Sequence, residues 1–130
     1  MDRRVALVKW AQTKIGTPFI WGKSDCTTIL LEGFSLFYKE SLPIDITWLS
    51  LKDAIKAFKK YGKPHDILES KEFFKVKRNF EQTGDIFIWQ GKGYYLVGFI
   101  INGNVMVADE GKLVEMRPIK TFTEYSCYRR

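Results

Sequence analysis

The chain has 130 residues, of which 45% are hydrophobic and 15% aromatic, a composition that excludes a disordered chain. This length predicts one domain over residues 1–130. No apolar run is long enough for a membrane span, and the run after the first arginines is too short for a signal peptide. The formal net charge of +6 favours an acidic partner, such as a nucleic acid, an anionic cell envelope or an acidic protein.

The first half of the chain has hydrophobic residues at helical spacing. We expect helices over residues 2–14, 26–38 and 51–61, each bounded by capping residues or by glycine and proline. Ser24 or Asp25 caps the second helix, and a capping box opens the third after a connection at 44–48. Gly62 and Pro64 end the third helix. Residues 65–82 have a mixed pattern that allows one short helix through Ile67, Leu68, Phe73 and Phe74.

From Gly84 onward the hydrophobic pattern changes to that of strands. We expect strands over residues 85–89, 94–101, 104–108 and 113–116 and a last one around 125–128. A turn over 90–93 and the pair Asn102-Gly103 mark hairpins. Helices followed by antiparallel strands predict an α+β fold, with N-terminal helices packed on a C-terminal antiparallel β-sheet.

Cys26 is the first candidate for chemistry, because it stands at the predicted start of the second helix. Unpaired backbone N–H groups and the helix dipole favour a thiolate at such a position. A second interpretation is that Cys26 is a small hydrophobic residue in the core. The other cysteine, Cys127, fits a buried position in the terminal strand, and we expect both to be reduced thiols.

A thiol nucleophile needs a base, and the chain has a single histidine, His65. His65 stands beside Pro64 in a predicted loop, where it is either an ordinary surface residue or a relocated catalytic base. One histidine and two distant cysteines do not make a zinc site, so the sequence predicts no metal and no cofactor.

The segment Gly16-Thr17-Pro18-Phe19-Ile20-Trp21-Gly22-Lys23-Ser24-Asp25-Cys26, followed by a core helix and by Gly84-Asp85 at the start of the sheet, resembles the NlpC/P60 family. These are papain-like cysteine peptidases and amidases that cut bacterial cell-wall peptides, and many are carried by phage tails. The resemblance spans nearly the whole chain and is greatest to small members encoded among phage and prophage tail genes. It places Cys26 at the nucleophile position, Asp25 at the acidic position before it, and Trp21 in the cleft beside the sulfur.

The sequence departs from this family at the catalytic base. Active members have a histidine in a His-Val-Gly-Ile type segment, and the matching stretch here is Leu96-Val97-Gly98-Phe99. The residue that orients the base aligns with Val107, Ala108 or Asp109. An ordinary thiol is only a few per cent thiolate at pH 7, and loss of a general base typically costs ~10²–10⁴ in rate.

These observations lead to three hypotheses of function. The first is a catalytically degenerate NlpC/P60-like domain that is a structural or adaptor component of a phage tail, located in the virion after assembly in the host cytoplasm. Its partners are then other tail proteins, with peptidoglycan as a further candidate. The second is an active cell-wall cysteine hydrolase with Cys26 as nucleophile and a base from His65 or a neighbouring subunit. The third is a nucleic-acid-binding protein, favoured by charge alone, whereas a solvated helix face explains most of the lysines.

Aromatic residues beside basic ones are typical of protein interfaces, and the chain has more aromatics than one small core requires. The interface candidates are Trp48, in the connection before the third helix, and Trp89 with Tyr94 at the first hairpin. For Trp89, packing at the end of a core strand is an equal alternative.

Overall fold

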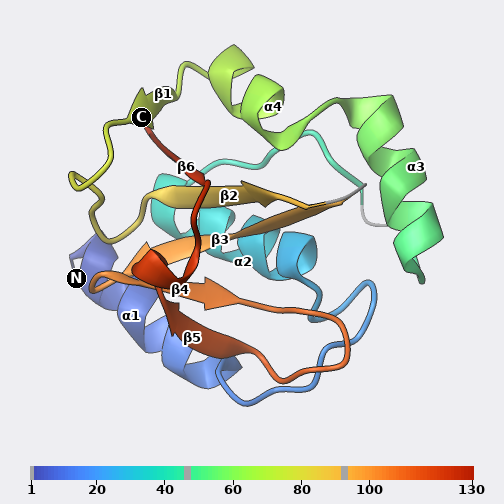
Figure 1. Cartoon of the computed structure of the whole chain (residues 1–130), viewed down its shortest axis with the longest axis horizontal. Helices are drawn as coiled ribbons and strands as arrows, with labels where there is room; N and C mark the ends of the chain where they lie inside the picture. The colour runs from blue at the N-terminus through green and yellow to red at the C-terminus, as the bar shows by residue number, and fades with distance from the viewer. Residues whose placement is uncertain (1, 46–47, 92–93) are drawn as a thin grey trace.

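The computed structural model describes residues 2–45, 48–91 and 94–130, and it has the predicted α+β class. Within these residues, four α-helices precede all the strands of a six-stranded antiparallel sheet (Figure 1). The helices are α1 (Arg3–Lys14), α2 (Cys26–Tyr38), α3 (Leu51–Tyr61) and α4 (Pro64–Ser70). The strands are β1 (Phe74–Val76), β2 (Ile86–Gln90), β3 (Tyr95–Ile101), β4 (Asn104–Val107), β5 (Glu115–Pro118) and β6 (Ser126–Arg129), with a 3₁₀ turn, η1, at Ile119–Thr121.

The sheet has the strand order β1-β6-β2-β3-β4-β5. Strands β2 and β3 form the central hairpin, in which Trp89 lies opposite Leu96 and Ile86 opposite Phe99. The C-terminal strand β6 inserts between β1 and β2, so the end of the chain completes the sheet (Figure 1). This order leaves β3 in the middle of the sheet, where helix α2 packs against it.

Both faces of the sheet are covered by apolar side chains. On one face, residues of α1 and α2 such as Leu7 and Phe34 pack with Phe99 of β3 in the larger core. On the other face, Phe87 and Cys127 pack against Phe122 and Tyr125 of the C-terminal segment. Cys127 is buried in β6, as the sequence predicts.

Two glycines allow this close packing. A Cβ atom on Gly33 of α2 would lie 2.6 Å from Phe99 and 2.7 Å from Trp10, so a side chain there would separate α1, α2 and β3. A Cβ atom on Gly98 would lie 2.2 Å from the Met106 carbonyl oxygen of β4. The glycine of the Leu96-Val97-Gly98-Phe99 segment is therefore required by the pairing of β3 with β4.

Three predicted boundaries were wrong. Pro64 begins α4 instead of only ending α3, because proline fits the first turn of a helix. The short helix ends at Ser70, and Phe74 belongs to β1, which pairs with β6. The strand expected from residue 113 begins at Glu115, and Leu113 is exposed. The connection at 44–48 and the turn at 90–93 include residues 46–47 and 92–93, which lie outside the described residues.

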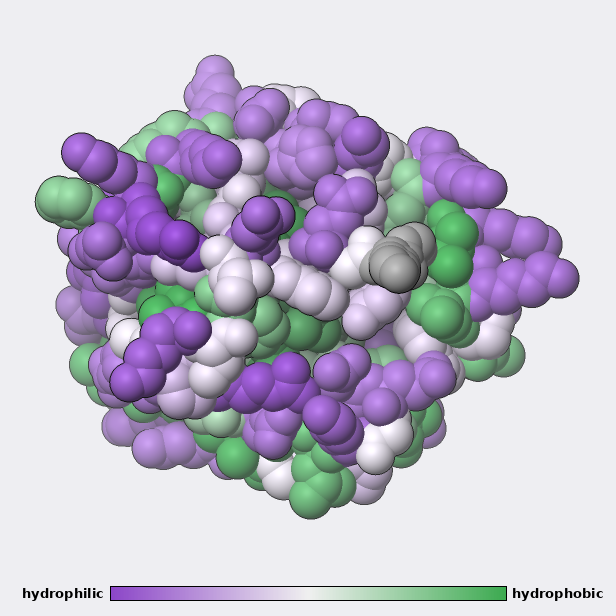
Figure 2. Space-filling model, in the orientation of Figure 1, coloured by the Kyte–Doolittle hydropathy of each residue, from purple (hydrophilic) through white to green (hydrophobic). Residues whose placement is uncertain are grey.

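Helix α3 stands at the edge of the molecule, with hydrophobic residues on its inner side and hydrophilic residues on its outer side (Figure 2). Ala54 is its buried residue, and Ser50 caps its first turn by accepting a hydrogen bond from the Asp53 amide. No helix in the described part of the chain is long and apolar enough to cross a membrane.

Candidate functional site

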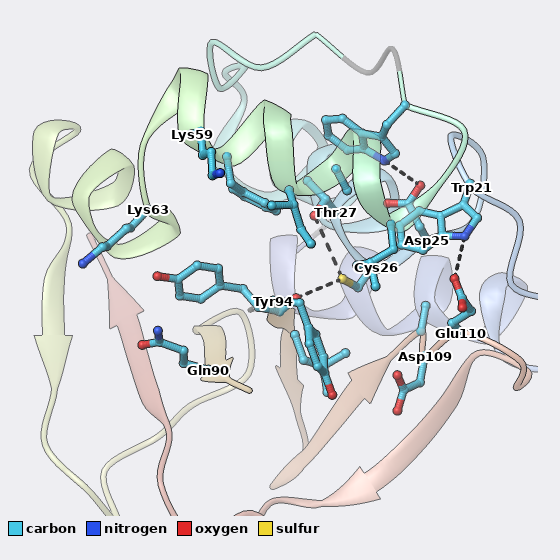
Figure 3. A pocket seen from close by; sticks show the side chains of 18 of the residues that line it. Trp21, Asp25, Cys26, Thr27, Lys59, Lys63, Gln90, Tyr94, Asp109 and Glu110 are labelled. Atoms are coloured by element: carbon cyan, nitrogen blue, oxygen red, sulfur yellow. Dashed lines mark hydrogen bonds between the residues drawn. The ribbon is translucent and has the colours of Figure 1, made fainter. Parts of the chain in front are cut away.

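A cleft of about 730 Å³ opens between the start of α2, helix α3 and the β2–β3 hairpin (Figure 3). This volume is within the range of pockets that bind small ligands or short peptide segments. Most of the lining is apolar or aromatic, and ionisable side chains lie toward its two ends. The lining includes Trp21, Asp25, Cys26, Thr27, Trp48, Leu51, Phe58, Lys59, Lys63, Asp66, Tyr94, Tyr95, Leu96, Asp109 and Glu110.

Cys26 is the first residue of α2 and faces the cleft. The residue before it, Asp25, is the N-cap: its extended backbone precedes the helix, and its Oδ1 accepts a hydrogen bond from the Thr28 amide at 2.9 Å. The helix therefore begins where an acidic cap meets an apolar run, as the sequence predicts. Its start places the sulfur against β3.

The Asp25 carboxylate is buried and accepts hydrogen bonds from three separate segments. Besides the Thr28 amide, its donors are the Thr28 hydroxyl at 2.7 Å, the Gly22 amide at 2.7 Å and the Trp48 indole N–H at 3.2 Å. These four bonds connect α2 to the loop before it and to the segment before α3. Asp25 therefore organises the wall of the cleft, and its oxygens are occupied.

The sulfur of Cys26 has weakly polar neighbours. Its thiol donates to the Tyr95 carbonyl oxygen at 3.9 Å, and the Thr27 hydroxyl lies 4.0 Å away (Figure 3). Burial raises the pKa of the Cys26 thiol to about 11, and the negative charges of Asp25 and Asp109 act in the same direction. The raised pKa runs against the expectation that the helix start favours a thiolate, and its largest cause is the desolvation of the sulfur.

No histidine lines the cleft in the described part of the chain. His65, the relocated-base candidate, lies in α4 instead of a loop and lines a second, neighbouring hollow with Trp89 and Tyr125. Its Nε2 lies 3.5 Å from Asp66 Oδ1. Leu96, where the resemblance to the NlpC/P60 family would place the base, is only 4% exposed and lines the cleft.

The end of β4, where the resemblance to the NlpC/P60 family would place the residue that orients the base, has no imidazole. Ala108 is buried at the end of β4, and the following Asp109 faces the cleft. The Asp109 carboxylate accepts a hydrogen bond from Arg117 at 3.3 Å. Cys26, Asp25 and Asp109 are thus close together without an imidazole between them.

Trp21 lies at the mouth of the cleft on the side of Cys26 (Figure 3). Its indole N–H donates to Glu110 at 2.7 Å, and its ring packs edge-to-face on Phe19 with 4.8 Å between centroids. The contact with Glu110 joins the Trp21 loop to the segment after β4. Trp21 is therefore held in place before any ligand binds.

The interface candidates have different surroundings. Trp48 is 2% exposed, so the expectation that it contacts a partner from the surface is wrong: its ring fills the space beside α2, and its N–H satisfies Asp25. Tyr94 lines the cleft, whereas Trp89 lines the neighbouring hollow, and both are half-buried. Their rings meet at 5.9 Å between centroids.

Sequence reasoning missed Lys59 and Lys63 as cleft residues. Both line the cleft from the end of α3 and the start of α4, beside Phe58 (Figure 3). Their spacing of four residues next to an apolar face was the available signal, but a solvated helix gives the same pattern. Among the described residues, no cluster of three or more histidine, cysteine or acidic side chains is arranged to hold a metal ion.

Comparison with known families gives one result. Residues 1–125 match the model of a family described as a domain of unknown function, DUF6950. A search of curated proteins found no match to the chain.

Proposed function

The chain belongs to the DUF6950 family, and from its cleft we propose that it is a catalytically degenerate, papain-like domain of the NlpC/P60 type. In this proposal the domain is a structural or adaptor component of a phage tail or related particle. The cleft holds a ligand or partner without cutting it. The particle assignment rests on the resemblance of the segment from Gly16 to Cys26 to the small tail-associated members of that family.

The observation that carries the proposal is the surroundings of the Cys26 sulfur. A cysteine hydrolase needs a thiolate and a group that protonates the leaving amine. Here the thiol has a pKa of about 11, its hydrogen-bond acceptor is a backbone carbonyl, and Leu96 occupies the family's base position. A pKa of about 11 leaves roughly one thiol in 10⁴ ionised at pH 7.

The fold is consistent with the papain-like arrangement. Cys26 begins the core helix and packs against the central strand of an antiparallel sheet, and Asp85 precedes the first strand of the central hairpin. Asp85 is buried and paired with Arg129, so its retention has a structural explanation independent of catalysis.

Activity toward cell walls provides the first test. Purified protein is incubated with peptidoglycan sacculi, and released peptides are measured by mass spectrometry beside an active cysteine hydrolase as positive control. We expect no fragments above background and the same result for Cys26→Ala. Cleavage that Cys26→Ala abolishes would overturn the proposal, and a further loss in His65→Ala would identify a relocated base.

Thiol reactivity provides an independent test of the same site. In a Cys127→Ala background, alkylation of Cys26 by iodoacetamide should be at least ~10-fold slower at pH 7.5 than that of a free thiol with the ordinary pKa of 9.0, because the ~100-fold lower thiolate fraction is partly offset by the higher nucleophilicity of a more basic thiolate. The rate should increase up to about pH 11. The same measurement in urea supplies the unfolded reference. A rate that reaches its plateau near pH 7 would indicate a thiolate nucleophile and contradict the proposal.

The adaptor role is tested in the particle. Tyr94→Ala changes a half-buried cleft residue, whereas Cys26→Ala changes only the sulfur. We expect Tyr94→Ala to reduce incorporation into particles or binding to neighbouring tail proteins, and Cys26→Ala to leave both unchanged. The opposite result would assign the function to the sulfur.

A further inference from the structure

The two ends of the cleft differ in charge. Lys59 and Lys63 line it on the side of α3 and α4, and Asp109 and Glu110 line it on the opposite side, with Cys26 and Tyr94 between them (Figure 3). The acidic groups already have partners: Asp109 pairs with Arg117, and Glu110 accepts the indole N–H of Trp21. The negative end is therefore largely satisfied within the chain.

The lysine end has ammonium groups available to a ligand. Both side chains belong to exposed residues, and within the described ranges neither forms a salt bridge or a side-chain hydrogen bond. The nearby carboxylate of Asp66 also lines this end and lies 3.5 Å from His65 Nε2. An anionic group entering here meets two cations and one carboxylate that already faces an imidazole.

The middle of the cleft is apolar. Its walls include Leu96 and the rings of Phe58 and Tyr95, whose centroids are 5.8 Å apart. Leu51, which also lines the cleft, is 41% exposed, so apolar surface extends from inside the cleft to an exposed side chain.

We propose, on the basis of the non-catalytic function above, that the cleft is a docking site for an acidic, apolar segment of a partner protein. One or two carboxylates of the segment pair with Lys59 and Lys63, and an apolar side chain of the same segment enters between Phe58, Tyr95 and Leu96. The exposed Leu51 at the lining of the cleft gives the segment a further apolar contact.

Charge and apolar surface together favour this occupant over other anions. A nucleic acid would need a track of cations along its backbone, but here two lysines are followed by an apolar wall and a carboxylate end. A cell-wall peptide would satisfy the lysines but leave the exposed Leu51 uncovered. An acidic and apolar protein segment uses all three features.

Synthetic octapeptides are the probes. One set has two neighbouring acidic residues and two large apolar residues; a second replaces the acidic residues by lysine; a third replaces the apolar residues by serine. Binding is measured by fluorescence anisotropy of labelled peptides and by the indole N–H signals of Trp21 and Trp48 in NMR spectra, which report on the cleft itself. We expect the first set to bind at least tenfold more tightly than either of the others.

Charge reversal locates the site. Lys59→Glu with Lys63→Glu should weaken binding of the first set at least tenfold, and the weakening should diminish at high salt. Lys52→Glu with Lys56→Glu is the matched control, because it makes the same change in net charge at exposed positions of α3 that do not line the cleft. For the apolar part, Leu51→Ser should weaken binding, and Leu113→Ser, also exposed but outside the cleft, should not.

The remaining outcomes separate this inference from the proposed function. Equal binding of the acidic and lysine sets, or equal effects of the two double variants, overturns the inference, as does tighter binding of a cell-wall stem peptide or of oligo(dT). Each of these leaves a non-catalytic domain in place. Cleavage of any probe that depends on Cys26, detected by mass spectrometry, overturns the proposed function instead.

Discussion

Asp25 has a different role from the one that its position beside Cys26 suggests. An aspartate next to a candidate nucleophile suggests a part in catalysis. In the structure it caps α2, fixes the Gly22 amide in the preceding loop and accepts the indole N–H of buried Trp48. A residue of this kind is retained for architecture even when no reaction takes place beside it.

Replacing Asp25 should therefore destabilise the fold. Asp25→Ala removes a helix cap, which typically costs about 0.5–2 kcal/mol, and leaves buried donors unpaired, at about 1–3 kcal/mol for each group that water does not reach. We expect a loss of about 2–4 kcal/mol in the free energy of unfolding, measured by urea denaturation with circular dichroism.

Asp2→Ala is the control for this change. Asp2 caps α1 through the Arg4 amide at 2.7 Å but is exposed and has no buried donor to satisfy. Its loss should cost less than about 1 kcal/mol. Equal effects of the two variants would show that the Asp25 bonds to Gly22 and Trp48 contribute little.

At the scale of elements, the sequence predicts what local signals determine. The start of α2 at Cys26, the start of α3 after Ser50 and the hairpin at Asn102-Gly103 all follow from capping or turn residues, and all are present. The sequence does not predict elements that form by pairing with a segment far away along the chain. Strand β1 has three residues and exists through its pairing with β6, more than fifty residues later. No local pattern in Phe74–Val76 indicates that partner.

The placement of β6 also depends on a non-local ion pair. Arg129 donates two hydrogen bonds of 2.8 Å to the carboxylate of Asp85, which is 2% exposed and also accepts from the Gln82 amide. The pair holds the terminal strand against the turn that leads into β2. Its geometry is bidentate, which makes it stronger than a single contact.

Removing the arginine should destabilise the sheet. Arg129→Met leaves the buried Asp85 carboxylate without its cation, a change that typically costs about 3–5 kcal/mol for fully buried pairs; the partial exposure of Arg129 reduces our expectation to about 2–3 kcal/mol. Arg117→Met is the control, since its partners Glu115 and Asp109 are more exposed and it should cost less than about 1 kcal/mol. Thermal and urea unfolding measure both, and a similar loss in the two variants would contradict the assignment.

At the scale of the whole molecule, the candidate site depends on how the parts meet. The motif around Cys26 can be recognised in the sequence, and so can the leucine at position 96, where the resemblance to the NlpC/P60 family would place a histidine. The sequence does not predict the raised pKa of the thiol or the position of Lys59 and Lys63 in the cleft. Both features depend on tertiary contacts, namely the packing of β3 against the sulfur and of α3 beside the β2–β3 hairpin. Burial depends on tertiary packing, so no local rule predicts either feature.

The pH dependence of stability should show the combined effect of four cysteine and tyrosine side chains whose pKa values are raised. Burial raises the pKa of Cys26 to about 11 and those of Tyr38, Cys127 and Tyr128 to about 12, from ordinary values of 9.0 for cysteine and 10.0 for tyrosine. In the unfolded chain these groups release their protons first. Above about pH 9 the unfolded state therefore binds fewer protons than the folded state, and the free energy of unfolding decreases as pH rises.

At acidic pH the free energy of unfolding changes with pH in the opposite direction. Hydrogen bonding to Arg130 lowers the pKa of Glu40, and hydrogen bonds from Trp10 and Lys14 outweigh burial to lower that of Glu32, from the ordinary 4.5. The stability that these carboxylates contribute is present above pH 4.5 and is lost as pH falls through their folded pKa values. Together the two sets of groups predict a plateau of stability from about pH 5 to pH 9.

Melting temperatures measured from pH 3 to pH 11 test this profile. In Cys26→Ala the decline above pH 9 should be shallower than in the parent, because one of the groups responsible has been removed; the comparison uses the slope, since the substitution also changes the stability at neutral pH. Leu113→Ala, an exposed change without a titrating group, should keep the parent slope. A decline above pH 9 that is steeper in Cys26→Ala than in the parent would mean that the thiol is more easily ionised in the folded protein than in the unfolded chain, and it would restore Cys26 as a candidate nucleophile.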